Sequence, residues 1–188
     1  RAGVNAGNSI ASGGNYNVVV GDEAGTAITT GDENTFVGYT AGDAVTTASA
    51  NTGVGYAALS ANTSGTQNSA FGNRAGDAIT TGDGNTAIGY FSLSTTTTAD
   101  NNTAVGVDSL GINSTGADNT AIGKDALRAN TTASNNTAVG SSALVANTTG
   151  AQNTAVGYQA AVALTTGANT VAIGYQAGDA LTTGSNNI

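Results

Sequence analysis

Few side chains in this sequence can do chemistry. The chain has no Cys and no His, which excludes thiol nucleophiles, thiolate metal sites, His-based triads and typical zinc sites. Its 12 acidic residues are scattered, and they lack the Gly-Gly-x-Gly-x-Asp pattern of calcium-binding repeats. We therefore interpret the acids as solvated turn charges. The sequence predicts no enzyme, no metal and no other cofactor.

A row of tyrosines is the first candidate binding surface. Each of them directly follows a glycine that recurs along the chain. After other copies of this glycine the same place holds a charged residue, so we expect the rings to be exposed. Tyr provides a large contact area at low entropic cost, which suits the binding of a host surface protein or a glycan. The alternative is that the rings only cover the turn beneath them. The row consists of Tyr39, Tyr56, Tyr90, Tyr158 and Tyr175.

A column of threonines is the second candidate. If the preceding residue points inward, this column points outward and forms a flat ladder like the face of an ice-binding solenoid. The alternative is that Thr simply suits a pleated surface. We expect no ice activity, and no effect of Thr80→Tyr or Thr131→Tyr in an ice assay. The column consists of Thr29, Thr46, Thr63, Thr80, Thr97, Thr131, Thr148, Thr165 and Thr182.

Charge and hydropathy exclude several partners. The formal net charge is −8, with only four basic residues, so the clustered Lys and Arg of a nucleic-acid-binding surface are absent. No apolar run approaches the roughly 18 residues of a membrane span, and we expect no signal peptide. The sequence therefore predicts no nucleic-acid partner and no membrane insertion.

These candidate side chains are positioned by an internal repeat. Every seventeenth position from Gly21 to Gly174 is a glycine, and Gly3 opens one further copy that has a single-residue insertion. Residues 1–188 thus form a single array of about eleven coils, with no capping segment. The chain begins with Arg1, has no Met and stops within a repeat, so we expect it to be an excerpt of a longer protein.

Numbering each copy from its glycine as position 1 reveals the local structure. Position 14 is Asn in nearly every copy, position 16 is mostly Ala, and position 17 is always Val, Ile or Phe. The alternation over positions 15–17 predicts a strand with 15 and 17 inward and 16 outward. A second strand is expected at positions 7–10, as in residues 78–81. Glycines at positions 1 and 11 would make the bends.

Positions 5 and 8 exchange a large aliphatic side chain between them. Where position 5 is Gly or Ala, position 8 is aliphatic, as in the pair Ala161 and Leu164. Where position 5 is Leu, position 8 is polar, as in the pair Leu127 and Asn130. A close-packed interior admits one large side chain in a given volume. We therefore expect both positions to reach the same interior volume.

A 17-residue unit rich in Gly, Thr and Asn is too short for a helical hairpin and poor in helix formers. The pattern predicts an all-β parallel β-solenoid of 17-residue coils, with an Asn ladder inside one turn. A single thin coil buries little, so stability depends on stacked neighbours. The small side chains at position 16, expected on the outside, would let another chain approach closely, which favours an oligomer.

The segment Asn-Thr-Val-Ala-Ile-Gly at residues 169–174, and the many Asn-Thr-Ala-Val-Gly copies, resemble the head repeats of trimeric autotransporter adhesins and the repeats of phage tail-fibre-like surface proteins. The resemblance covers the whole chain. It implies a left-handed β-roll, three chains side by side as a homotrimer, and attachment at the tip of a fibre. The adhesin repeat is usually shorter, near fourteen residues, so the extra residues must enlarge a turn or a strand.

Together these observations predict a structural or adhesive fibre segment for surface attachment, either an adhesin head or a tail-fibre shaft. It would lie outside the cell, on a cell surface or a virion. Its partners would be copies of itself and a host surface protein or glycan. The alternatives are an ice-binding β-solenoid with a Thr ladder, and a subunit of a self-assembling extracellular filament.

Overall fold

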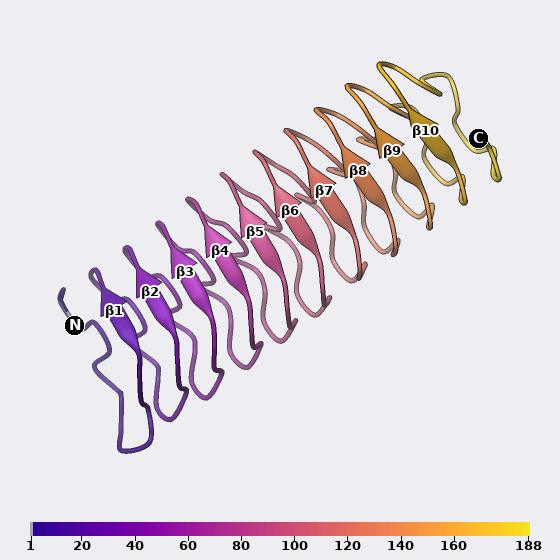
Figure 1. Cartoon of the computed structure of the whole chain (residues 1–188). Coiled ribbons are helices and arrows are strands. Elements are labelled where there is room, and N and C mark those ends of the chain that lie inside the picture. Colours follow the sequence, from indigo (N-terminus) through magenta and orange to yellow (C-terminus); the bar gives the residue numbers. More distant parts are fainter. Residues whose placement is uncertain (1) are drawn as a thin grey trace.

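The computed structural model describes residues 2–188 and is an all-β parallel β-solenoid (Figure 1). Ten short strands, one per coil, form a single sheet in sequential order, and each strand pairs in parallel with the next, as Thr103 does with Thr120. The described residues contain no helix. The strands are β1 (Val18–Val20), β2 (Thr35–Val37), β3 (Thr52–Val54), β4 (Ser69–Phe71), β5 (Thr86–Ile88), β6 (Thr103–Val105), β7 (Thr120–Ile122), β8 (Thr137–Val139), β9 (Thr154–Val156) and β10 (Val171–Ile173).

The second strand expected at positions 7–10 is wrong. These residues form a turn followed by bends in the coils that contain β1 to β10. Their backbone still bonds to the neighbouring coil. The amide N of Thr29 donates to the carbonyl O of Thr46 at 2.9 Å, and the Thr131 amide N donates to Thr148 at 3.1 Å. The segment thus stacks coil on coil without the extended geometry of a strand.

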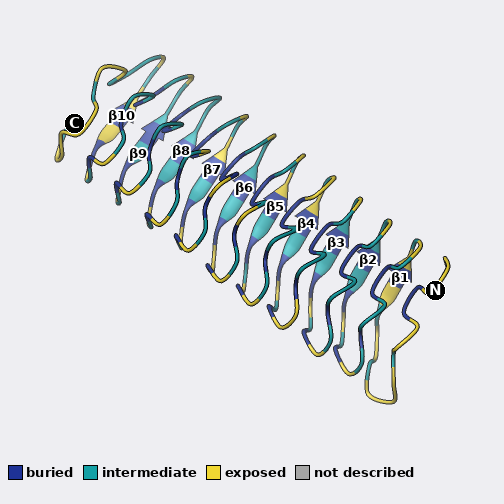
Figure 2. Cartoon of the chain, turned by 180° about the vertical axis from the view of Figure 1, so that it is seen from behind, coloured by how far each residue is buried: buried dark blue, intermediate teal, exposed yellow. Residues whose placement is uncertain are grey.

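The side-chain direction expected for the strand is also wrong, because position 16 points inward and positions 15 and 17 point outward. Ala104 and Ala121 are fully buried, whereas Ile88 and Ile122 are 40% and 39% exposed (Figure 2). Alternation alone permits either phase. The coil is so thin that Ala at positions 4 and 16 and one larger aliphatic already fill a layer, so Val or Ile at position 17 lies outside.

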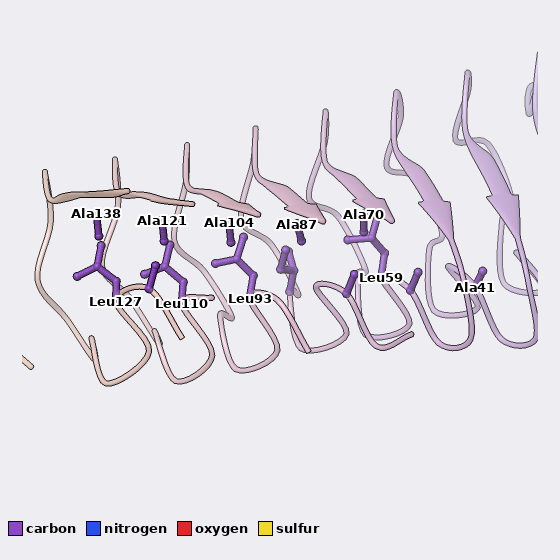
Figure 3. Packing of buried hydrophobic residues seen from close by; sticks show 14 of the residues in the cluster. Ala41, Leu59, Ala70, Ala87, Leu93, Ala104, Leu110, Ala121, Leu127 and Ala138 are labelled. Carbon is purple, nitrogen blue, oxygen red and sulfur yellow. The ribbon is translucent and has the colours of Figure 1, made fainter. Parts of the chain in front are cut away.

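The interior consists of these alanines and of the aliphatic at position 5 or 8. Figure 3 shows Ala87, Ala104 and Ala121 in one row, facing a second row that contains Leu93 and Leu110. All five side chains belong to one continuous buried cluster. Each coil adds one such layer, so the core continues along the rod and no coil has a complete core of its own.

The interpretation that positions 5 and 8 share one interior volume is supported by the packing. Leu127 at position 5 and Leu164 at position 8 are both fully buried. A Cβ added at Gly76 would lie 3.0 Å from Ile79 Cδ1 and 3.2 Å from Leu59 Cδ2. The position-8 aliphatic therefore occupies the space that the position-5 side chain fills in the other class of coil.

The coil of Phe36 shows how the same volume is shared when one side chain is unusually large. Phe36 replaces Ala at position 16 and is fully buried. Position 16 of the next coil is Gly53, where a Cβ would lie 2.9 Å from Phe36 Cδ1, and position 5 of that coil is Gly42, where a Cβ would lie 2.5 Å from the ring. Two neighbours are thus reduced to glycine so that one ring fits.

Four positions in the coil have positive φ. The glycine at position 1 has φ between 127° and 143° in the ten regular copies, as expected, but the glycine at position 11 does not have positive φ. The other three are positions 3, 5 and 13, which mostly hold non-glycine residues such as Arg74, Leu127 and Gln152. Inter-coil bonds hold them: the Arg74 amide N donates to the Tyr56 carbonyl O at 2.8 Å.

The one-residue insertion lies in the first coil, where it widens one loop (Figure 1). Gly13, at the corner between positions 10 and 11, has φ 121°. The neighbouring interior is unchanged, because Asn17 at position 14 still donates from Nδ2 to the Gly31 carbonyl O at 2.7 Å and accepts the Asn34 amide N at 2.9 Å. The corner therefore absorbs the extra residue.

Candidate functional surfaces

A buried asparagine ladder at position 14 holds one corner of the coil. From Asn17 to Asn153 the Oδ1 of each Asn accepts the backbone N–H of position 14 in the next coil, as Asn102 accepts that of Asn119 at 3.0 Å and Asn153 that of Thr170 at 2.9 Å. The side-chain Nδ2 of Asn119 also donates to the Ala133 carbonyl O in the coil beyond, at 2.9 Å. The expected Asn ladder is thus present, and its role is structural because its members are buried.

A second buried ladder was not identified from the sequence. In three consecutive coils the polar residue at position 8 is Asn, and Nδ2 of Asn130 donates to Oδ1 of Asn113 at 2.9 Å, while Nδ2 of Asn147 donates to Oδ1 of Asn130 at 3.2 Å. Each also donates to the position-11 carbonyl of its own coil, as from Asn147 to Gly150 at 2.9 Å. Successive Asn residues at position 8 were the signal for it.

The hydroxyls of the threonine column at position 9 are hydrogen-bonded to the backbone of the next coil. Thr80 Oγ1 donates to the Thr97 carbonyl O at 2.9 Å, and Thr131 Oγ1 donates to the Thr148 carbonyl O at 3.1 Å. The same bond recurs in every coil from Thr29 to Thr165. The column forms a ladder as expected, but most of its members are only partly exposed, and it stabilises the stacking of coils.

The neighbouring column, at position 10, is the exposed one. It is Thr in nine regular copies and Ser64 in the tenth, and all ten are exposed. Their hydroxyls make no hydrogen bond within the described residues, in contrast to those at position 9. Neither column contains a charged residue. We name the position-10 column the threonine row.

The tyrosines are exposed, with fractions from 45% for Tyr56 to 73% for Tyr175. They form two stacked pairs and one separate ring. Tyr39 and Tyr56 have ring centroids 5.6 Å apart with planes at 16°, and Tyr158 and Tyr175 are 5.5 Å apart at 15°. Tyr90 instead packs edge-on against its own neighbour Phe91. The structure therefore brings together two pairs near opposite ends of the array and leaves Tyr90 between them.

The acidic residues do not gather into a metal site. Within residues 2–188 no group of three or more Asp and Glu side chains lies close enough to hold a metal ion. At position 12 the carboxylates bond to the backbone of the previous coil: Asp83 Oδ1 accepts the Thr66 amide N at 2.6 Å, and Asp100 Oδ1 accepts the Asp83 amide N at 2.8 Å. These acids thus close a turn.

Two acids at position 6 are partly buried. Burial raises the pKa of Asp77 above its ordinary value, against the opposing effect of Arg74, whose Nη1 lies 3.9 Å from Asp77 Oδ2. Asp77 Oδ1 is buried without a hydrogen-bond partner among the described residues. Burial likewise raises the pKa of Asp43. The two lie two coils apart with Ser60 between them, so they do not form a carboxylate pair for acid–base chemistry.

The outer face of the sheet carries one column of large apolar side chains beside a column of mostly Thr, and this face was not expected. We name the outward residues at positions 15 and 17 of β1 to β10 the sheet face. Position 17 is Val, Ile or Phe in every strand, and position 15 is Thr, Ser or Val. Phe71, Ile88 and Ile122 are between 39% and 42% exposed. The recurring large residue at position 17 was the signal for this face, but it had been assigned to the core.

A hollow lies beside the coil that contains β10. It has a volume of about 410 Å³ and is lined by β10 together with Leu181 and Ile188. It exposes the same kind of interior surface that each preceding coil buries against its neighbour.

Among residues 2–188 no helix is long and apolar enough to cross a membrane. Comparison with known protein families, with curated proteins and with solved structures finds no match.

Proposed function

We propose that this chain is a structural segment of an adhesive fibre that attaches one surface to another. The observation that carries the proposal is the uniform rod: ten parallel strands in one register, stacked coil on coil over a filled interior. Such a rod supplies length and rigidity. With strands about 4.8 Å apart, ten coils extend roughly 45 Å. The fibre would work outside the cell, on a cell surface or a virion.

The contact surface we assign to this function is the two stacked tyrosine pairs. Their exposed rings offer flat apolar area next to a hydroxyl group, which suits a glycan or a host surface protein. The test is binding of the chain to cells and to immobilised glycans, before and after all four paired tyrosines are changed to Ser. Tyr16→Ser is the matched control, because Tyr16 is 84% exposed but belongs to neither pair.

We expect binding that the fourfold change removes and that Tyr16→Ser leaves intact. Binding that survives the loss of both tyrosine pairs would refute their role. If the isolated rod binds no cell and no glycan, attachment is refuted for this segment and its function is that of a passive shaft.

The fibre we propose contains three copies side by side. Support comes from the resemblance of the repeats to those of trimeric adhesins and from the apolar sheet face. Light scattering measures the assembly directly: a homotrimer has three times the 18.0 kDa mass of the chain, and a mass of one chain at high concentration would refute the proposal.

An ice-binding solenoid is the second candidate, and the threonine row favours it. Ten exposed β-branched or hydroxyl side chains at one coil spacing form a regular, uncharged file. It is a single file, because the position-9 hydroxyls are already bonded within the chain. We expect no thermal hysteresis. Ice binding through the threonine row would be established if hysteresis were present and were abolished by Thr81→Tyr and Thr132→Tyr but not by Thr80→Tyr.

A further inference from the structure

The sheet face is an uncharged part of the surface where two copies of this acidic chain can approach each other. None of the twenty residues at positions 15 and 17 of β1 to β10 is charged. The 12 acidic residues all lie at positions 2, 3, 6, 12 and 13, on the turns. At a net charge of −8, copies repel each other through those turns, and the repulsion is weaker at the two uncharged stretches, the sheet face and the threonine row.

The position-17 side chains also give the sheet face an exposed apolar column along the rod. Val20, Phe71, Ile88, Ile122 and Ile173 are each 39% exposed or more, and they stand in one line along the rod with the position-17 valines between them. Soluble monomers rarely expose an apolar patch of more than a few hundred Å². The threonine row, on a different part of the coil, has no such column of large apolar side chains.

The area of the sheet face is close to what a stable pair requires. Ten strands about 4.8 Å apart and three residues of about 3.3 Å each give roughly 450 Å² of flat area per copy. Two copies would thus remove somewhat more than about 900 Å² from water, near the lower limit of about 1,200 Å² for a specific interface. Each added coil enlarges the interface in proportion, so association strengthens with the length of the array.

The periodicity of the face selects its partner. Its side chains repeat at the coil spacing over ten strands, and only a surface with the same spacing keeps ridges and grooves matched along the whole length. A second copy of this chain has that spacing. A globular partner would contact a few strands and leave the rest exposed.

We propose that the sheet face packs against the sheet face of further copies of this chain. The rods are parallel and at the same axial level, so that each position-17 residue contacts its counterpart. This inference rests on the proposed function, in which copies lie side by side with one polarity in a fibre. In a closed ring about an axis parallel to the rods, equivalent residues lie at equal heights. The Phe71 rings of all copies would then gather at one level.

The first test is the change Ile122→Glu, which places a charge on the sheet face, with Thr132→Glu as the matched control on the threonine row. Light scattering should show that Ile122→Glu shifts the assembly to single chains at concentrations where the parent and Thr132→Glu remain associated. Circular dichroism of the same samples establishes that the coils are folded. If Ile122→Glu fails to fold, Ile122→Thr serves instead, because Thr occurs on the same face.

The second test uses the absence of Cys from the chain. With Val139→Cys as the single cysteine, mild oxidation should produce cross-linked pairs, because parallel copies bring the two thiols to one level. Cysteine at Thr149, on the threonine row, should give none. In an antiparallel pair centred on the array, Val139→Cys would cross-link only to Val54→Cys, and that result would overturn the parallel arrangement.

Salt gives an independent readout. Screening of the net charge should strengthen an apolar association, so the assembly should become tighter as ionic strength rises. A chain that stays single at all salt concentrations, or an Ile122→Glu variant as associated as its parent, would overturn the interface. Both outcomes are distinct from the loss of glycan or cell binding, which would refute the proposed function while leaving the interface standing.

Discussion

Moving the large aliphatic of one coil from position 5 to position 8 is the sharpest test of the packing. The coil that contains Leu59 and Asn62 is suited to it, because the coils on both sides have Gly at position 5 and Val45 or Ile79 at position 8. Asn62 therefore has no Asn neighbour in the position-8 ladder. The double change Leu59→Gly and Asn62→Leu converts this coil to the class of its neighbours.

The two single changes should each be costly. Leu59 is fully buried, so the cavity that Leu59→Gly leaves should lower the free energy of unfolding by about 2–5 kcal/mol. About 1 kcal/mol of this loss is offset, because glycine tolerates the φ of 55° at this position. Asn62→Leu crowds a volume that Leu59 already fills, at about 1–3 kcal/mol. It also removes the acceptor of the Gly65 amide N, which lies 2.8 Å from Asn62 Oδ1, at about 1 kcal/mol.

The double change should restore most of the loss. The single changes sum to about 3–8 kcal/mol, whereas the pair should remain within about 2 kcal/mol of the parent, because one large side chain again fills the layer. Urea unfolding followed by circular dichroism measures all four proteins. If the double variant loses as much free energy of unfolding as the two single variants together, positions 5 and 8 do not share one volume. The explanation of the two coil classes then fails.

Four other changes test the side-chain directions, the Asn ladder and a partly buried acid. Ala121→Glu places a carboxylate in the core and should abolish cooperative unfolding. Ile122→Glu, on the sheet face, should leave the thermal midpoint of the single chain nearly unchanged. Equal effects of the two changes would mean that the side-chain directions of β7 are misassigned. Asn102→Ala removes the acceptor of the Asn119 amide N and should lower the free energy of unfolding by about 1–3 kcal/mol, and a neutral result would show that the ladder contributes nothing. Burial raises the pKa of Asp77, so the folded state binds that proton more readily than the unfolded state and gains stability as pH falls through the folded pKa. Asp77→Asn should therefore raise the thermal midpoint at neutral pH, with an advantage that shrinks in acid; an advantage that grows in acid would contradict this sign.

The period, the parallel stacking and the exchange between positions 5 and 8 could be predicted from sequence, because each depends on which residue types recur at fixed intervals. The phase of the strand could not. A short strand such as Thr120–Ile122 alternates equally well in either direction, and the larger side chains suggested the wrong interior. What decides the phase is the thickness of the coil, which follows from the opposing Ala and Leu residues and not from the strand itself.

The turn geometry was also beyond sequence reasoning. Residues such as Arg74, Leu127 and Gln152 adopt left-handed φ values that glycine would adopt more easily, so no residue preference marks them. Bonds between adjacent coils hold the backbone there, and those bonds exist only once the coils are stacked. The hydrogen bonding of the threonines could not be predicted either. Among the described residues the hydroxyls at position 9 are bonded and those at position 10 are not, and this difference depends on the path of the neighbouring coil.

The constant length of the coil has a consequence for how such an array can change by recombination. If residues 90–106 were lost, Gly89 would be followed by Val107, which again is position 2, and both Asn85 and Asn119 would keep a position-14 neighbour. The rod would shorten by about 4.8 Å with every ladder rejoined. Loss of a single residue has no such remedy, except at a loop corner like that of Gly13. The copy number of the repeat can thus vary between descendants, and the length of the rod with it, while the chemistry of each face is inherited unchanged.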